Sequence, residues 1–332
     1  MIRIFAVFAL LMALAPARAH EVRPAYLEID QSGAGTYKVT WKQPSRGNLA
    51  LHLVPHISNG WLESPPSARY AAEGFLIRTW IIKTNEAAHL AGRTVTIEGL
   101  ENTITDVFVR VRLVHGQALD KIVRPGSPSF RISLQNGNAM PVYSFILLGI
   151  EHILSGLDHL AFVLGLLLLV SDRWMLLKTV TSFTVAHSLT LAAATLGTIS
   201  LYQPLLDALI GLSILFLAPE IIRARKGGTS LTIRYPWIVA FAFGLVHGLG
   251  FASGLTSLGL DRGSLLGALV SFNVGVEIGQ LAFIGTAISL YVAFGLTKVT
   301  WPRGVALAPA YVIGISGAMW TFQYSAAALT GY

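Results

Sequence analysis

The chain has 332 residues, of which 53% are hydrophobic and only 12% carry a charged side chain. A soluble domain carries about 25% charged residues, so the composition excludes an ordinary soluble protein and predicts an integral membrane protein. The lack of any cysteine excludes disulfides, thiolate metal ligands, iron–sulfur ligation and cysteine nucleophiles. The formal net charge of +7 does not indicate nucleic-acid binding, because the basic residues flank apolar segments as membrane orientation requires.

Residues 1–19, MIRIFAVFALLMALAPARA, predict a secretory signal peptide. Arg3 precedes a short apolar run, and an Ala-x-Ala cleavage site ends at Ala19. Cleavage leaves His20 as the mature N-terminus, where its amine and imidazole form a chelating pair for copper or nickel. The alternatives are an uncleaved anchor and a histidine that stands at this position by chance.

Residues 20–136 have the alternating pattern of β-strands. Short runs rich in Val, Ile, Thr and aromatic residues are separated by turn residues, and seven of them read AYLEID, TYKVTW, LALHLV, FLIRTWIIK, TVTIEGL, DVFVRVRLV and SFRISL. This pattern predicts an all-β, sandwich-like domain, which the signal peptide places in the periplasm. Its histidines are interpreted as ordinary surface residues: His52, His56, His89 and His115.

Residues 137–332 predict an all-α membrane domain of six transmembrane helices. Apolar segments at about 143–170, 174–197, 201–222, 237–258, 264–294 and 305–328 each have the roughly 20 residues that a span needs. If the β-domain is outside, the inner connections hold eight basic residues: Arg173, Lys178, Arg223, Arg225, Lys226, Arg234, Lys298 and Arg303. The outer connections hold only Arg262. The positive-inside rule then predicts a multi-pass protein of the bacterial inner membrane, with its N-terminal domain and C-terminus periplasmic.

The first apolar segment contains "GIEHILSGLDHLAF" (149–162), in which polar residues interrupt the apolar run. In one continuous helix, His152 and His159 are two turns apart on one face with Ser155 between them. Glu151 and Asp158 repeat the same step on the adjacent face. The two imidazoles would lie roughly 10 Å apart along the membrane normal, at 1.5 Å per residue.

Further polar residues lie within the later segments. His187 and His247 are near the middle of the second and fourth, and Asp207 and Glu220 are near the ends of the third. A stripe in the fifth is spaced i, i+4, i+7 and consists of Asn273, Glu277 and Gln280. Neutral imidazole suits nickel, zinc, copper and cobalt, and carboxylates supply compensating charge.

The pattern predicts one shared metal site inside the bundle. Its predicted ligands are His152, Asp158, His159, His187, His247 and Glu277, supported by Glu151, Ser155, Asp207, Asn273 and Gln280. The simpler alternative is that single intramembrane histidines and amides only hydrogen-bond between helices. The joint occurrence of four such histidines with carboxylates favours a functional site, because ionisable groups are costly in hydrocarbon. Asp207 and Glu220 have a second alternative, as solvated charges at span ends.

At these residues the sequence resembles the HupE/UreJ family of bacterial membrane proteins, in its longer branch with an extracytoplasmic N-terminal domain. The matching pieces are HEVRPAYLEI, GIEHILSGLDHLAFVLGLLLL, SFTVAHSLTL, DALIGLSI, FGLVHGLGFA and FNVGVEIGQL. The resemblance implies a nickel or cobalt permease, with site residues at His152, Asp158, His159, His187 and Glu277. The sequence departs from the shorter permeases at Ile153, where they often have Pro, and at Ala186, where they often have Gly.

Three functions remain open. The first is a permease for a divalent metal, nickel or cobalt above zinc or copper, that enters from the periplasm. The second is an intramembrane zinc-dependent hydrolase, because three histidines with a carboxylate also form a catalytic zinc set. The third is a metal sensor or assembly factor whose β-domain binds a periplasmic partner. The metal ion and the lipid bilayer are the expected partners, without nucleic acid.

Overall fold

The computed structural model describes residues 24–33, 35–46, 49–50, 52–72, 75–84, 90–103, 105–114, 117–133, 135–136, 142–199, 202–252, 262–295 and 307–330. They form two compact units, each described by itself. The β unit holds the strands within Val22–Ser144, and the helical unit holds the helices within Phe145–Ser253 and Leu265–Tyr332. The predicted signal peptide, His20, His89 and His115 lie outside the described residues.

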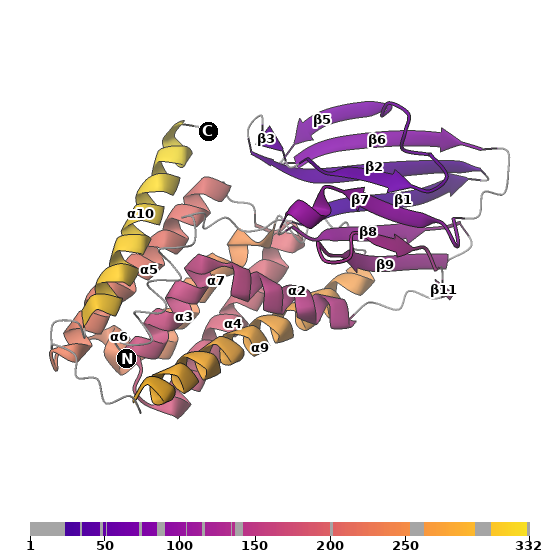
Figure 1. The fold of residues 1–332 in the computed structure, drawn as a ribbon. Coiled ribbons are helices and arrows are strands. Elements are labelled where there is room, and N and C mark those ends of the chain that lie inside the picture. The colour runs from indigo at the N-terminus through magenta and orange to yellow at the C-terminus, as the bar shows by residue number, and fades with distance from the viewer. Residues whose placement is uncertain are drawn as a thin grey trace. The chain divides into compact units, whose positions relative to one another are not determined.

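The β unit confirms the predicted β-rich N-terminal domain (Figure 1). Its strands are β1 (Ala25–Gly33), β2 (Thr36–Arg46), β3 (Leu49–Ala50), β4 (Val54–Ile57), β5 (Ala68–Ala72), β6 (Phe75–Lys83), β7 (Thr94–Glu98), β8 (Val107–Arg112), β9 (Gln117–Val123), β10 (Ser129–Arg131) and β11 (Gln135–Asn136). The larger sheet has the order β11-β9-β8-β1-β2-β6-β5, with β3 paired to β2, and the smaller sheet has the order β10-β7-β4. Strands β1 and β8 are parallel.

Both sheets contribute to one hydrophobic core. Leu27 and Ile29 of β1 lie in it with Val109 of β8, while Val95 and Ile97 come from β7 of the smaller sheet. Successive side chains of a strand point to opposite faces, so core residues alternate with outward-facing residues along β1 and β7. Strands β5 and β9 were not among the seven predicted runs, because ARYAA and QALDKIV have few β-branched residues.

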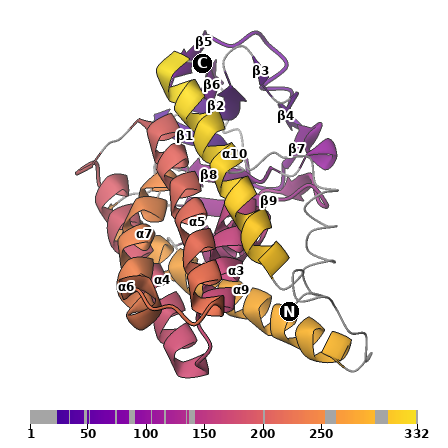
Figure 2. The same ribbon diagram turned by 90° about the vertical axis from the view of Figure 1, so that its left-hand side faces the viewer.

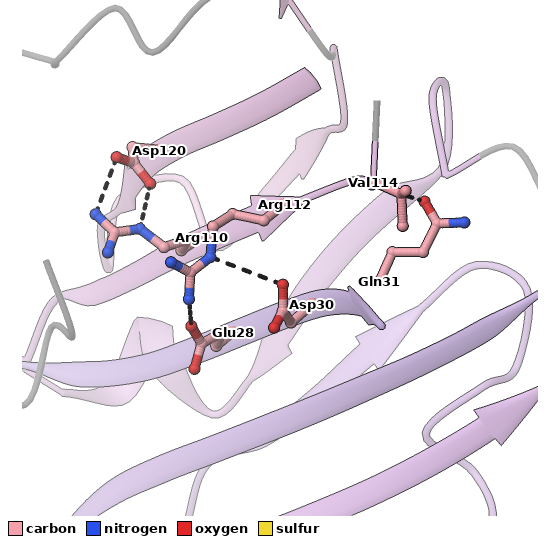
Figure 3. A network of polar contacts seen from close by, with 7 residues as sticks. All are labelled: Glu28, Asp30, Gln31, Arg110, Arg112, Val114 and Asp120. Atoms are coloured by element: carbon pink, nitrogen blue, oxygen red, sulfur yellow. Dashed lines mark hydrogen bonds and ion pairs between the residues drawn. The ribbon is translucent and has the colours of Figure 1, made fainter. Parts of the chain in front are cut away.

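The opposite face of the larger sheet carries paired charges (Figure 3). Arg110 is buried and donates to both oxygens of Asp120, from Nε at 2.8 Å and from Nη2 at 3.1 Å. Arg112 lies between Glu28, 2.5 Å from its Nη2, and Asp30, 3.8 Å from its Nε. The forked pair of Arg110 and Asp120 has a defined geometry and supports the register of β8 and β9, while Arg112 links β8 to β1.

The described part of the helical unit consists of eight helices (Figure 2). They are α2 (Val142–Ser155), α3 (Leu157–Leu169), α4 (Arg173–Thr195), α5 (Gln203–Arg225), α6 (Leu231–Arg234), α7 (Pro236–Gly250), α9 (Arg262–Gly295) and α10 (Ala308–Thr330). Helices α5 and α10 lie side by side in both views (Figures 1 and 2).

The helical unit has two helices that are long and apolar enough to cross a membrane by themselves, among the described residues. They are Gln203–Arg225 and the part Leu265–Ala293 of α9, and the bent pair α2–α3 makes a third if it is one span. The protein therefore has plausible membrane-spanning helices, while six spans stay a prediction. Helix α7 has only 15 residues, fewer than the roughly 20 that a straight span needs.

The prediction of one continuous helix over 143–170 is wrong. Helix α2 ends at Ser155, α3 begins at Leu157, and their axes differ by 76°. Gly156 between them has an extended conformation, with φ −77° and ψ 99°. Glycine favours such a break because its helix propensity is low, and Asp158 stabilises the new helix start by accepting from the backbone N–H of His159 at 2.8 Å.

Candidate metal site in the helical unit

Three buried imidazoles converge where α2 ends, α3 begins and α4 passes. One nitrogen from each of His152, His159 and His187 lies within 4.8 Å of the other two. The helix break causes this convergence, because it brings the ring centroids of His152 and His159 to 4.8 Å. A straight helix would have held them roughly 10 Å apart.

Asp158 orients His159. Its Oδ1 lies 2.9 Å from His159 Nδ1. A carboxylate oxygen accepts, so Nδ1 carries the proton and Nε2 of His159 has the lone pair. A carboxylate bonded to the far nitrogen of a ligating histidine is a common partner around protein metals. Asp158, predicted as a ligand, lies in the position of such a supporting residue.

Asn273 fixes His187 in the same way. The Nδ2 of Asn273 donates to Leu269 O at 2.8 Å, which turns its Oδ1 toward His187 Nδ1 at 3.2 Å. Because Oδ1 accepts, the proton of His187 is on Nδ1 and the lone pair is on Nε2.

His247 of α7 stands beside this group, with its ring centroid 5.2 Å from that of His159. Ser213 Oγ donates to Ile210 O at 2.6 Å and lies 2.9 Å from His247 Nε2. A hydroxyl has one proton, so the serine accepts from Nε2–H and the lone pair of His247 is on Nδ1.

One ring nitrogen of each of the four histidines lacks a hydrogen-bond partner in the described part of the chain. These nitrogens are His152 Nε2, His159 Nε2, His187 Nε2 and His247 Nδ1, and all four are buried. A buried polar atom without a partner costs about 1–3 kcal/mol. For three of the four histidines the unpaired atom is a lone pair, which a cation satisfies directly.

The predicted stripe on α9 faces α4. Thr181 Oγ1 donates to Glu277 at 2.6 Å, and Thr184 Oγ1 donates to Gln280 Oε1 at 2.9 Å. Glu277 therefore bonds to a threonine and is not part of the three-imidazole group. These contacts, with the bond from His187 to Asn273, form a row of polar side chains along the interface of α4 and α9.

The other predicted supporting residues lie around the group. Ser155 Oγ donates to His152 O at 3.3 Å, Glu151 is partly buried on α2, and Asp207 Oδ1 accepts from Gln203 at 2.9 Å. Glu220 is buried rather than solvated, paired with Arg223 at 2.5 Å and with Ser230. It ties the end of α5 to the loop before α6.

Sequence reasoning missed Ser213 and Thr181. Each is a small hydroxyl residue in an apolar helix, and such residues usually bond to their own helix backbone. Ser213 bonds to His247 and Thr181 bonds to Glu277, each on another helix. Predicting either contact requires knowledge of which helices pack together.

A sequence profile described as HupE / UreJ protein matches residues 129–324. The match covers all the residues of the three-imidazole group and more than half of the chain. The chain belongs to the HupE/UreJ family. This confirms the resemblance to the HupE/UreJ family, which is associated with nickel and cobalt handling. Comparisons of this HupE/UreJ protein with curated proteins and with solved structures gave no significant match.

Proposed function

We propose that this HupE/UreJ protein binds a divalent transition-metal ion at His152, His159 and His187 and carries it across the inner membrane. Nickel is the first candidate and cobalt the second. The observation that carries the proposal is the convergence of three imidazole nitrogens within 4.8 Å. The bonds from Nδ1 of His159 to Asp158 and from Nδ1 of His187 to Asn273 leave a lone pair on Nε2 of both rings. Imidazole sets of this kind suit nickel, cobalt, zinc and copper.

His247 provides a further nitrogen beside His159, and Glu277 and Gln280 continue the polar row along α4 and α9. Several moderate positions in series favour passage, because a conducting site must bind an ion without trapping it. In the proposed orientation the β unit and the C-terminus face the periplasm. That orientation rests on the loop charges and the signal peptide.

The test is uptake into proteoliposomes from a panel of Ni²⁺, Co²⁺, Zn²⁺ and Cu²⁺, with binding measured by titration calorimetry. His187→Ala removes one ligand of the three and should lower both affinity and uptake at least ~10-fold, the effect of about 1.4 kcal/mol. His52→Ala is the matched control, because His52 is exposed in the β unit. Equal metal affinity and equal uptake in the two variants would contradict the proposed site.

A zinc-dependent hydrolase is the second candidate, because three converging imidazoles with an open position are also a catalytic zinc set. Such an enzyme needs a general base near the bound water. Both predicted carboxylates are already engaged, Asp158 with His159 and Glu277 with Thr181. Hydrolysis of a peptide or ester panel without metal uptake would favour this candidate over transport.

A further inference from the structure

Two pairs of helices in the helical unit share short sequence patterns. Helices α2 and α7 each contain Gly-x-x-His, as Gly149 to His152 and Gly244 to His247. Helices α4 and α9 each contain Ser-Phe-x-Val, at 182–185 and 271–274. Patterns this short do not by themselves demonstrate a duplication. The contacts that the equivalent residues make provide the stronger comparison.

The equivalent residues make equivalent contacts. A Cβ atom at Gly149 would lie 2.0 Å from Phe272 O, and a Cβ atom at Gly244 would lie 2.5 Å from Phe183 O. Helix α2 therefore packs against α9, and α7 packs against α4. In both interfaces the helices are so close that only glycine fits at the contact.

One turn further along, the correspondence continues. Gly248 follows His247 as Ile153 follows His152, and Thr190 stands at the place in α4 that Gly279 has in α9. A Cβ atom at Gly248 would lie 2.3 Å from Thr190 Oγ1, and one at Gly279 would lie 2.3 Å from Ile153 Cγ2. The same pair of positions meets in both interfaces. The glycine is on α7 in the first interface and on α9 in the second.

Helices α5 and α10 form the third pair. A Cβ atom at Gly211 would lie 2.8 Å from Thr321 N, and one at Gly317 would lie 2.5 Å from Leu215 N. Leu215 is four residues after Gly211, and Thr321 is four residues after Gly317. A local two-fold rotation that exchanges α5 with α10 therefore maps this contact onto itself.

Helices α2, α4 and α5 run in the opposite direction to their counterparts α7, α9 and α10. His187 meets Asn273, whereas the earlier residues Thr181 and Thr184 meet the later residues Glu277 and Gln280, so α4 and α9 are antiparallel overall. The glycine contacts make α2 parallel to α9 and α4 parallel to α7. Helix α2 is consequently antiparallel to α7, and the two-fold axis is perpendicular to the helices.

The pseudo-symmetry includes two pairs of buried aromatic rings, one pair at each end of the group of four histidines. The first aromatic pair is Phe162 and Phe183, with centroids 5.1 Å apart, and both rings lie 5.1 Å from His247. The second aromatic pair is Phe251 and Phe272, with centroids 4.9 Å apart.

The second pair meets the symmetry-related histidine. His152 lies 4.2 Å from Phe251 and 5.4 Å from Phe272, centroid to centroid. His152 is also 4.8 Å from His159, which is 5.2 Å from His247. Ring contacts therefore connect the second aromatic pair, the histidines and the first aromatic pair in that order.

We propose that the helical unit holds two inverted repeats, one of α2, α4 and α5, in which α3 continues the broken α2, and one of α7, α9 and α10. We propose further that the two aromatic pairs are gates that open alternately to opposite sides of the membrane. The inference rests on the proposed function and makes the protein a carrier rather than a channel. Inverted repeats with a broken helix at the binding site are a recurrent basis of alternating access, because the repeats can exchange conformations about the fixed site.

Both aromatic pairs are closed in this structure, which corresponds to an occluded state. In the proposed orientation the second aromatic pair faces the periplasm, since Phe272 precedes Asn273 on a helix that runs inward. The first aromatic pair faces the cytoplasm, since Phe183 lies one turn before His187 on a helix that runs outward. Opening either pair alone gives access to the histidines from one side.

The test uses the cysteine-free sequence. Ser213→Cys places one thiol beside His247, and an impermeant thiol reagent is added to one side of oriented vesicles. With Phe251→Ala and Phe272→Ala, labelling from the periplasmic side should accelerate at least ~10-fold, the effect of about 1.4 kcal/mol on the open population. With Phe162→Ala and Phe183→Ala, the acceleration should occur from the cytoplasmic side instead.

Phe145→Ala is the matched control, because Phe145 is a fully buried phenylalanine of α2 outside both aromatic pairs. Acceleration from the same side in both double variants, or acceleration equal to that of the control, would overturn the two-gate proposal. The labelling requires no metal, so a failure to bind Ni²⁺ would refute the proposed function without deciding the gates.

A second measurement uses the unaltered protein. A carrier exchanges ions, so unlabelled Ni²⁺ inside vesicles should accelerate entry of radiolabelled Ni²⁺. Uptake without such acceleration would indicate a channel and contradict alternating access even if the double variants fail to fold.

Discussion

At the scale of single residues, the helical unit gives three of its histidines a fixed proton position. Asp158, Asn273 and Ser213 each bond to one ring nitrogen of a different histidine and leave the other nitrogen buried without a hydrogen-bond partner among the described residues. These supporting residues are as informative as the histidines, because they determine which atom is available to a ligand.

Asn273→Ala should weaken Ni²⁺ binding about 10–100-fold, the usual effect of losing such a supporting contact. His187 would keep its position in the helix but lose the acceptor that fixes its proton on Nδ1. Calorimetry checks this, with Ser271→Ala as the control on the same helix, since Ser271 donates only to Gly267 O in the described contacts. Equal affinities of the two variants would contradict the assigned role of Asn273.

His56 of the β unit should make stability depend on pH. Its hydrogen bond to Glu63 raises the pKa of His56 above the usual value, burial opposes this, and Glu98 raises the pKa further. A raised folded-state pKa stabilises the fold fully below the unfolded value of about 6.5 and ceases to do so as pH rises through the folded value.

The thermal midpoint of the β unit, measured in the whole protein, should therefore exceed that of the His56→Gln variant. The difference between the two midpoints should be largest at acidic pH and should fall above about pH 6.5. His52→Gln is the control, because His52 is exposed. A constant difference between wild type and His56→Gln across this range would exclude the ion pairs as its cause.

The sequence located the histidines because polar residues in apolar runs are conspicuous. It did not identify their partners. The pairing of His247 with Ser213, or of Thr181 with Glu277, joins residues that are 34 and 96 positions apart. Such pairs depend on which helices pack together, which periodicity does not encode.

At the scale of elements, glycines determine how closely the helices approach. A Cβ atom at Gly248 would lie 2.2 Å from the carbonyl oxygen of His187. Gly248→Ala should therefore separate α7 from α4, move His187 and His247 apart, and reduce metal affinity at least ~10-fold, because ligand geometry tolerates only about 0.5 Å of error.

The matched control is Gly285→Ala in α9, where an added Cβ meets no described atom within 4 Å. Alanine there should leave affinity unchanged and slightly stabilise the helix. Calorimetry with circular dichroism at matched protein concentration separates the two effects, and unchanged affinity in Gly248→Ala would contradict the close-packing argument.

The helix elements were predictable in existence but not in detail. Apolar runs located each long helix to within several residues, whereas the break at Gly156 was missed. Its neighbours Leu154, Ser155 and Leu157 continue a helical pattern, and a single glycine inside such a pattern does not by itself predict a break.

At the scale of the whole molecule, the loop charges give a topology that can be tested without a transport assay. Thr198 follows α4 and Lys226 follows α5. If α5 crosses the membrane, Thr198→Cys should react with an impermeant thiol reagent from the periplasmic side, and Lys226→Cys only after the cytoplasmic side is opened. The cysteine-free parent is the blank, and labelling of both positions from one side would refute the crossing.

The four unpaired imidazole nitrogens also bear on how long the protein survives in the cell. A ligand that binds only the folded state stabilises it by about 2.7 kcal/mol at 100 times its dissociation constant. Metal-starved cells would thus hold a form that unfolds more often and is degraded sooner, because a change of 1–2 kcal/mol alters abundance several-fold. The supply of the ion would then set the number of copies in the membrane, with no dedicated regulator and at constant synthesis.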